Sequence, residues 1–168
     1  MVDRDVILAK VGTIQRCLNR VEKVTELNPD SLDNNLDVQD IFVLNVQRAV
    51  QATLDLAAHI VADEGLGVPQ ELRENFDLLE RNGILNRELS GRLRKMVGFR
   101  NIAVHEYESI NLDILKSILQ YNLRDLEECY MNILRYYDME WQGTVCQCYS
   151  VTVRNKGGKS DARWVARS

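Results

Sequence analysis

LDVQDIFVLNVQRAVQATLDLAAHIVAD, residues 36–63, is the stretch that decides the fold of this chain of 168 residues. On a helix its apolar residues follow two sides rather than one, with Phe42, Val46 and Val50 along the first and Leu54, Ala58 and Val61 along the second. Apolar residues on several faces are typical of a helix buried at the centre of a bundle. We therefore expect a central helix over residues 36–63, with the other elements packed around it.

The same stretch carries a row of polar residues at spacings of 3, 4 and 4, namely Arg48, Gln51, Asp55 and His59. These spacings place all four on one side of the helix. Two interpretations remain open. The row is either a solvated face or a polar strip that lines a groove or an interface.

Four further segments show a helical period. Residues 3–27 carry apolar positions at alternating spacings of four and three, which suits packing against another helix. After the glycine- and proline-containing break at residues 65–69, Gly83 is placed to end a short third helix and Asn86 to cap a fourth. A fifth helix is expected over residues 111–138. The core positions expected in these segments are Ile7, Val11, Ile14, Leu18, Val21, Leu72, Phe76, Leu79, Leu89, Leu93, Met96, Leu112, Leu115, Leu119, Leu126, Ile133 and Tyr137.

Five helices with short links and no alternating strand pattern predict an all-α fold, a helical bundle in one domain. The composition agrees, since 45% of the residues are hydrophobic and 27% are charged. No apolar run approaches the roughly 18 residues of a membrane span, and the charged N-terminus lacks a signal core, so we expect a cytoplasmic protein with no membrane partner. No P-loop and no Gly-Ser nucleotidyltransferase signature is present, and we expect no cofactor.

The last segment differs from the rest of the chain. From about Trp141 the composition becomes β-like and then loop-like, and residues 141–168 carry five basic residues and one acidic residue. We therefore predict a helical domain over 1–139 and a tail over 140–168, which is an appended or read-through segment, a short hairpin or a disordered end, and we assign it no function. Cys17 and Cys129 are expected in the core, whereas Cys146 and Cys148 are too close for the usual zinc pair, so neither a metal site nor a disulfide framework is expected.

Charge is distributed unevenly along the chain, whose formal net charge is −4. Residues 81–100 hold six basic residues against one glutamate, although the body of the chain is acidic. This basic segment could attract phosphate, so Arg92, Arg94 and Lys95 are candidate contacts to an RNA backbone. The alternative is that the segment is simply a solvated helix face.

The basic segment leads to FRNIAVHEY, residues 99–107, which holds Arg100, Asn101, His105 and Tyr107. On a regular helix, residues five apart differ by about 140° in direction, so we expect the helix to end near His105 and to let Arg100, His105 and Tyr107 converge. A histidine with an ordinary pKa of about 6.5 can exchange a proton with a ribose 2′-OH or a leaving oxygen, and an arginine can hold the phosphate. These residue types suit RNA cleavage without a metal. Spacing alone also allows His105 to serve only at the helix C-terminus.

Residues 100–107 match R-x4-H-x-Y, and the chain resembles the HepT toxins of the HEPN superfamily, including the Asn that often follows the Arg. Residues 44–49, 66–69, 93–107 and 111–114 are also similar to HepT, and the likeness covers roughly residues 3–139. The resemblance implies a HEPN-like bundle that forms a homodimer with two motifs facing one cleft. It also implies an RNA-cleaving toxin of a type II toxin–antitoxin system of the MntA/HepT type.

In such pairs the partner is a cognate MNT-type nucleotidyltransferase antitoxin, which attaches AMP to the tyrosine of the motif. The resemblance thus implies that Arg100 and His105 are the catalytic pair, that Asn101 supports them, and that Tyr107 is the site of AMPylation. A bulky anionic adduct two residues from His105 would repel the RNA backbone. The alternative is a non-catalytic subunit that binds substrates for a nucleotidyltransferase complex.

Overall fold

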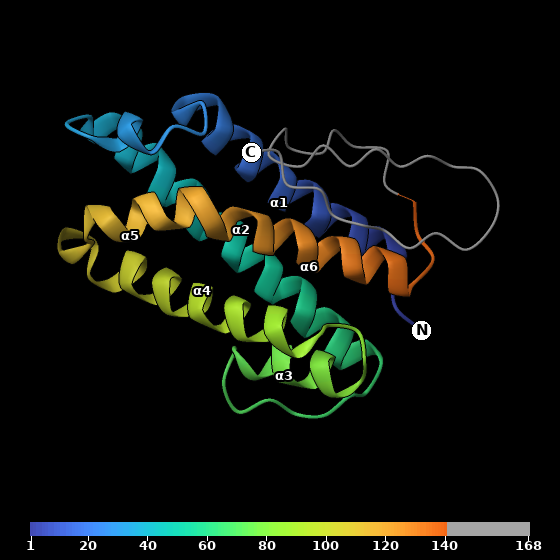
Figure 1. Cartoon of the computed structure of the whole chain (residues 1–168). Helices are drawn as coiled ribbons and strands as arrows, with labels where there is room; N and C mark the ends of the chain where they lie inside the picture. Colours follow the sequence, from blue (N-terminus) through green and yellow to red (C-terminus); the bar gives the residue numbers. More distant parts are fainter. Residues whose placement is uncertain (141–168) are drawn as a thin grey trace.

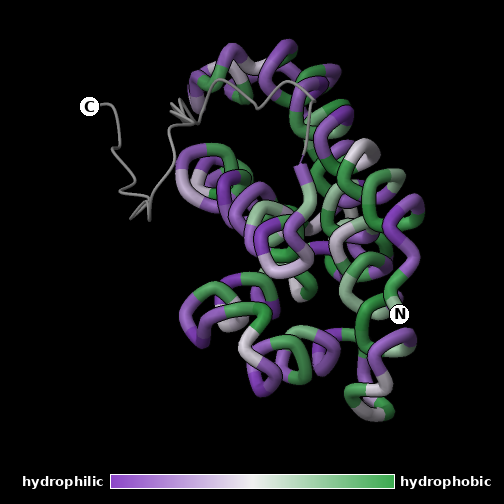
Figure 2. Tube along the Cα trace, turned by 90° about the vertical axis from the view of Figure 1, so that its right-hand side faces the viewer, coloured by the Kyte–Doolittle hydropathy of each residue, from purple (hydrophilic) through white to green (hydrophobic). Residues whose placement is uncertain are grey.

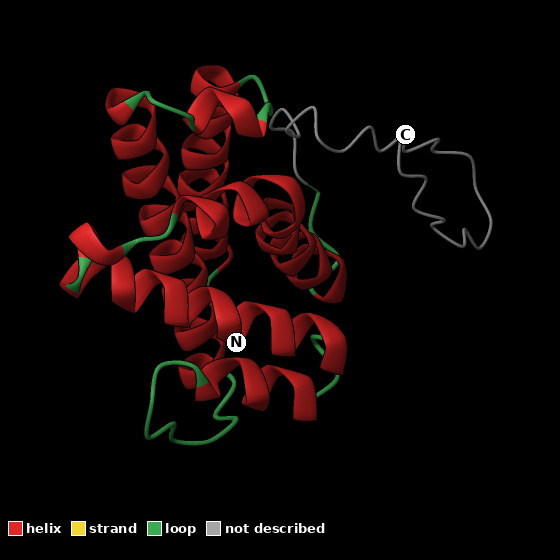
Figure 3. Ribbon diagram, turned by 60° about the vertical axis from the view of Figure 1, so that its left-hand side comes forward, coloured by secondary structure: helices red, strands yellow, loops and turns green. Residues whose placement is uncertain are grey.

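The computed structural model describes residues 1–140, apart from the side chain of Tyr107. The tail predicted over 140–168, with Cys146 and Cys148, lies outside the described residues but for Glu140. The described residues contain helices, turns and loops and no strand, which confirms the all-α prediction (Figure 3). The helices are α1 (Arg4–Thr25), α2 (Leu36–Asp63), α3 (Glu74–Arg81), α4 (Arg87–His105), α5 (Leu112–Ser117) and α6 (Leu123–Tyr136).

Short helical turns complete the described chain. Two 3₁₀ turns lie outside the main helices, η1 (Pro29–Leu32) and η2 (Tyr107–Ser109). A π-helical turn, η3 (Ile118–Asn122), joins α5 to α6, so that residues 112–136 form one continuous helical run. This run corresponds to the fifth helix expected from the sequence, and the described part of the chain is therefore the predicted bundle of five helices.

Helix α2 lies at the centre of the bundle, as its apolar pattern predicts. It contacts α1, α3, α4 and α6, and these helices surround it in Figure 1. Twelve of its residues are buried. Figure 2 shows apolar and polar residues alternating along the helices, as expected where each helix buries only part of its surface.

The predicted core residues are buried with a few exceptions. Leu72 is 51% exposed, so its assignment to the core was wrong, because α3 begins only at Glu74 and Leu72 precedes it. Ala58, Leu112 and Tyr137 are half-buried. Cys17 and Cys129 are in the core as expected, and burial raises the pKa of both thiols.

The predicted ends of α3 and α4 are confirmed. Gly83 follows α3 with φ of +74°, a left-handed conformation that favours glycine. The side chain of Asn86 accepts a hydrogen bond from the N–H of Leu89 at 2.8 Å and so caps α4. At the start of the chain Asp3 caps α1 in the same way.

The polar row of α2 has a hydrogen-bonded middle and two ends in different surroundings. Asp55 accepts hydrogen bonds from Lys10 of α1 at 3.0 Å and from Gln51 at 2.8 Å, so the middle of the row belongs to the contact between α1 and α2. His59 lies 3.5 Å from the carboxylate of Asp63 in the next turn. Arg48 is exposed and forms no ion pair with a described residue.

Candidate functional site

Helix α4 carries the predicted motif at its C-terminal end. Its last residue is His105, which confirms the helix end expected from the sequence, and the N–H of Glu106 donates to the carbonyl oxygen of Ile102 at 2.8 Å to close the last turn. The His105 side chain is exposed. An exposed imidazole at a helix end is accessible to a large substrate such as RNA.

Arg100 is half-buried, in the second-last turn of α4. Its Nη1 donates a hydrogen bond to the Oδ1 of Asn101 at 3.0 Å, and its Nε is buried with no hydrogen-bond partner among the described residues. The neighbouring amide therefore orients the guanidinium. The buried Nε–H is an unsatisfied donor, and a phosphate oxygen reaches it only when the side chain moves outward.

Arg100 and His105 both lie within α4, so the chain does not bend between them. Residues five apart on a helix point about 140° apart. Consistent with this, no hydrogen bond joins Arg100 to His105 among the described residues. The expected convergence of these two side chains within one chain is therefore not produced by the end of the helix.

The turn η2 follows α4 and begins at Tyr107. Ser109 ties it back to Glu106, because its N–H and its Oγ both donate to the Glu106 carbonyl oxygen, at 2.9 and 2.8 Å. The Ser109 Oγ also lies 3.5 Å from the Glu106 carboxylate. Ser109 was not predicted from the sequence, although a serine that bonds to the carbonyl oxygen three residues before it is typical of such a turn.

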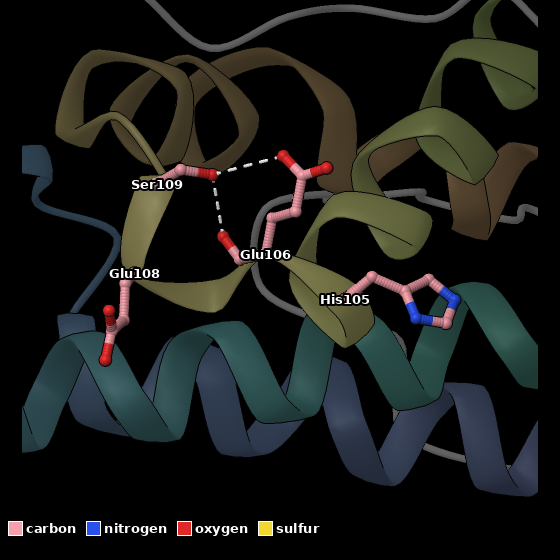
Figure 4. Close-up of a pocket in the computed structure, with 4 residues that line it drawn as sticks. All are labelled: His105, Glu106, Glu108 and Ser109. Carbon is pink, nitrogen blue, oxygen red and sulfur yellow. Dashed lines mark hydrogen bonds between the residues drawn. The ribbon is translucent and has the colours of Figure 1, made fainter.

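A shallow, open pocket of about 270 Å³ lies at this end of α4 and is lined by His105, Glu106, Glu108 and Ser109. In Figure 4 the imidazole of His105 points away from Glu106 and Ser109, which are joined by a hydrogen bond. The side chain of Glu108 points in a third direction. The side chains thus do not converge on one small ligand. The geometry fits a broad surface for a polymer better than a closed pocket.

The three candidate phosphate contacts lie in different surroundings. Arg92 binds the carboxylates of Glu88, Asp125 and Glu128 at 2.7, 2.8 and 2.9 Å, and Arg94 binds Asp77 of α3. Lys95 is exposed and forms no ion pair with any described residue. The ion pairs of the two arginines disfavour them as phosphate contacts and leave Lys95 as the better candidate.

Comparison with known proteins places this geometry in a family. The family model of ribonuclease HepT-like proteins matches residues 14–133. The mRNA nuclease HepT of Shewanella oneidensis is 41% identical over 124 residues, which are 74% of this chain and 92% of that relative.

Solved structures agree in fold. The crystal structure of a toxin–antitoxin with AMP-PNP contains a chain with a TM-score of 0.75 and 39% identity, over 79% of this chain and 99% of that one. A tri-AMPylated HEPN toxin of Shewanella oneidensis in complex with an MNT antitoxin has a TM-score of 0.74 and 39% identity over the same shares. The matched residues include the whole of α4 and the motif at its end. This chain therefore belongs to the family of HepT-like ribonucleases.

Proposed function

We propose that this chain is the toxin of a MntA/HepT-type toxin–antitoxin pair, a metal-independent endoribonuclease that acts in the cytoplasm as a homodimer. The observation that carries the proposal is the position of the motif. His105 is exposed at the end of α4, and the half-buried Arg100, hydrogen-bonded to Asn101, lies five residues earlier in a chain of the HepT-like family.

His105 is the proton-transfer group of the proposed reaction. Its exposed imidazole can accept the proton of a ribose 2′-OH, or donate one to the leaving 5′-oxygen. Arg100 binds the scissile phosphate and offsets the charge that develops on its oxygens. Asn101 supports it by accepting the hydrogen bond from its Nη1.

The homodimer follows from the directions of the two side chains. Arg100 and His105 leave α4 on different sides, so one chain by itself does not direct both at the same phosphate. A second copy with its own motif facing the first would supply the complementary group. Lys95, on an exposed part of the same helix, then contacts a neighbouring phosphate.

Neutralisation occurs at Tyr107, which begins the turn η2 directly after the catalytic histidine and Glu106. A nucleotidyltransferase antitoxin transfers the AMP group of ATP to its hydroxyl, which loses its proton, and pyrophosphate is released. Each added AMP places a phosphate next to His105, where it repels the RNA backbone and occupies the open surface. The relative solved as a tri-AMPylated toxin with an MNT antitoxin supports modification by AMP.

The catalytic assignment is tested by expressing the chain alone in bacteria. We expect growth arrest, which Arg100→Ala or His105→Ala abolishes. In vitro, His105→Ala should lower the rate of RNA cleavage by roughly 10²–10⁴-fold, with messenger RNA as the first substrate to test, and cleavage by the unaltered protein should persist in EDTA. Undiminished toxicity of both variants would overturn the catalytic pair.

The modification site is tested by mass spectrometry of the intact chain after co-expression with the cognate transferase. We expect a mass gain of one or more AMP units, and Tyr107→Phe should prevent it while leaving RNA cleavage in place. Tyr121→Phe, which alters an exposed tyrosine of the turn η3, is the matched control and should still be modified. An adduct that persists in Tyr107→Phe would show that another residue is the acceptor.

A further inference from the structure

Three exposed arginines gather along one edge of the contact between α1 and α2, away from the motif: Arg16 and Arg20 of α1 and Arg48 of α2. We call them the α1–α2 basic edge. None of the three forms an ion pair with a described residue. The hydrogen bond recorded for them is from the Nη2 of Arg16 to the hydroxyl of Thr13, at 3.0 Å.

The pairing of the two helices brings Arg48 level with this part of α1. The ion pair of Lys10 with Asp55 joins α1 to α2, which run in opposite directions. Cys17 follows Lys10 by seven residues on α1, and Arg48 precedes Asp55 by seven residues on α2. Because the helices are antiparallel, both residues lie about two turns from the ion pair in the same direction.

The surroundings of Cys17 agree with a position of Arg16 and Arg48 close to each other. Burial raises the pKa of the Cys17 thiol, while the positive charges of Arg48 and Arg16 act in the opposite direction. Both guanidinium groups thus act on the same sulfur, which agrees with the pairing of the two helices. Arg20 is one turn beyond Arg16 on the exposed side of α1 and extends the edge.

This concentration of charge is unfavourable for the isolated chain. Arg16 and Arg20 are four residues apart on α1, a spacing at which like charges destabilise a helix. Several other cations of the described surface are paired with carboxylates, as in Lys10–Asp55, Arg73–Glu71, Arg94–Asp77 and Lys116–Asp33, whereas unpaired ones such as Lys95 and Arg124 are not part of such a group of three. An anion from outside the chain would relieve the repulsion at the edge.

The edge and the motif are connected through α2, which contacts both α1 and α4 (Figure 1). Near Arg48 the exposed side of α2 also presents Leu44, which is 43% exposed. A single-stranded RNA held at Arg100 and His105 extends beyond them in both directions. An RNA long enough to pass from α4 over α2 would reach the three guanidinium groups of the edge.

We propose that the α1–α2 basic edge binds the phosphate backbone of the RNA at nucleotides away from the cleaved bond. The planar guanidinium matches two phosphate oxygens at once, and contacts to phosphate act on any base sequence. The edge therefore increases affinity for long RNA and has no part in the chemical step. This inference rests on the proposed ribonuclease function.

The test measures RNA binding as a function of salt in the full chain carrying His105→Ala, which prevents cleavage. The probe is a fluorescent single-stranded RNA of about 20 nucleotides, for which each lost phosphate contact reduces the slope of log K against log salt by about 0.7. Arg20→Gln/Arg48→Gln should make the slope shallower by about 1.4. The matched control, Arg124→Gln/Arg135→Gln, removes the same charge from exposed positions of α6 and should leave the slope unchanged.

The same double variants, with His105 restored, are then assayed for cleavage of a long RNA and of a dinucleotide. We expect KM for the long RNA to rise in Arg20→Gln/Arg48→Gln, with turnover of the dinucleotide unchanged. The inference is overturned if Arg20→Gln/Arg48→Gln has the same slope as the control. It is also overturned if this variant loses transferase binding or the dimer while its slope is unchanged. Failure of the unaltered protein to cleave any RNA would instead overturn the proposed function, and the binding slopes stay informative in that case.

Discussion

Arg92 holds α4 against α6 through carboxylates on both helices. Asp125 accepts a hydrogen bond from the Nε of Arg92, and its side chain is 2% exposed. Arg92→Ala would therefore leave a buried carboxylate without its cation. Removing one partner of a buried ion pair typically costs 3–5 kcal/mol, and because Arg92 is itself 30% exposed we expect about 3 kcal/mol. Urea denaturation of the two proteins measures this loss of unfolding free energy.

The control is Arg94→Ala, which removes a more exposed ion pair between α4 and α3. Both partners are reached by water, with exposed fractions of 40% and 25%, so we expect a loss of about 1 kcal/mol or less. Equal losses for the two variants would show that burial of Asp125 is not the source of the stability.

Single residues differed in how far their roles could be predicted. Asn86, His105 and Gly83 act within their own helix turns, and their roles as cap, helix end and left-handed residue follow from local spacing. Arg92 was expected to contact RNA because it lies in a basic segment. Its main partners lie on α6, 33 and 36 residues later, and only the packing of the two helices brings them together.

Two glycines show opposite roles at the scale of the helices. Gly83 ends α3 at a φ of +74°, where a side chain strains the backbone. Gly98 lies within α4 on its exposed side, and an added Cβ would meet nothing within 4 Å. We expect Gly83→Ala to lower the free energy of unfolding by about 1 kcal/mol and Gly98→Ala to raise it by about 1 kcal/mol.

Thermal and urea unfolding of both variants measure these changes, and each substitution serves as the control of the other because the added methyl group is the same. Destabilisation by Gly98→Ala at low protein concentration would contradict the open space seen around this residue.

The π turn η3 is an element that the sequence pattern did not reveal. Residues 111–138 keep their apolar positions close to a helical period, so the pattern predicts one regular helix. The structure inserts a wider turn at Ile118–Asn122, and the side chain of Asn122 then donates to Asp125 at 3.1 Å. A local change in helical pitch depends on packing against neighbours, which the period of apolar residues does not record.

At the scale of the whole molecule, the described bundle should be independent of residues 141–168. Leu134 and Ile133 are buried, while α6 ends at Tyr136 and the last described residue, Glu140, is exposed. We expect a chain that ends after Glu140 to keep its urea midpoint and its RNA cleavage. A chain that ends after Asn132 loses both buried residues and should not fold.

Far-ultraviolet circular dichroism and the cleavage assay distinguish these outcomes. If the chain that ends after Glu140 unfolds at a lower urea concentration than the full chain, the domain boundary predicted at residue 139 is too early. If its urea midpoint is unchanged but it no longer cleaves RNA, the last 28 residues take part in the function, contrary to the prediction that assigns them no function.

The sequence by itself determined the helical bundle, the central place of α2, the ends of α3 and α4, and the family, because these depend on local periodicity and on motifs of adjacent residues. Only the tertiary structure decided which charges are neutralised. It paired Arg92 with α6 and Lys10 with α2, and it left Arg16, Arg20 and Arg48 unpaired along one edge. It also showed that Arg100 and His105 leave an unbroken helix on different sides. Electrostatic pairing depends on distances between helices, and such distances are fixed by packing rather than by order in the chain.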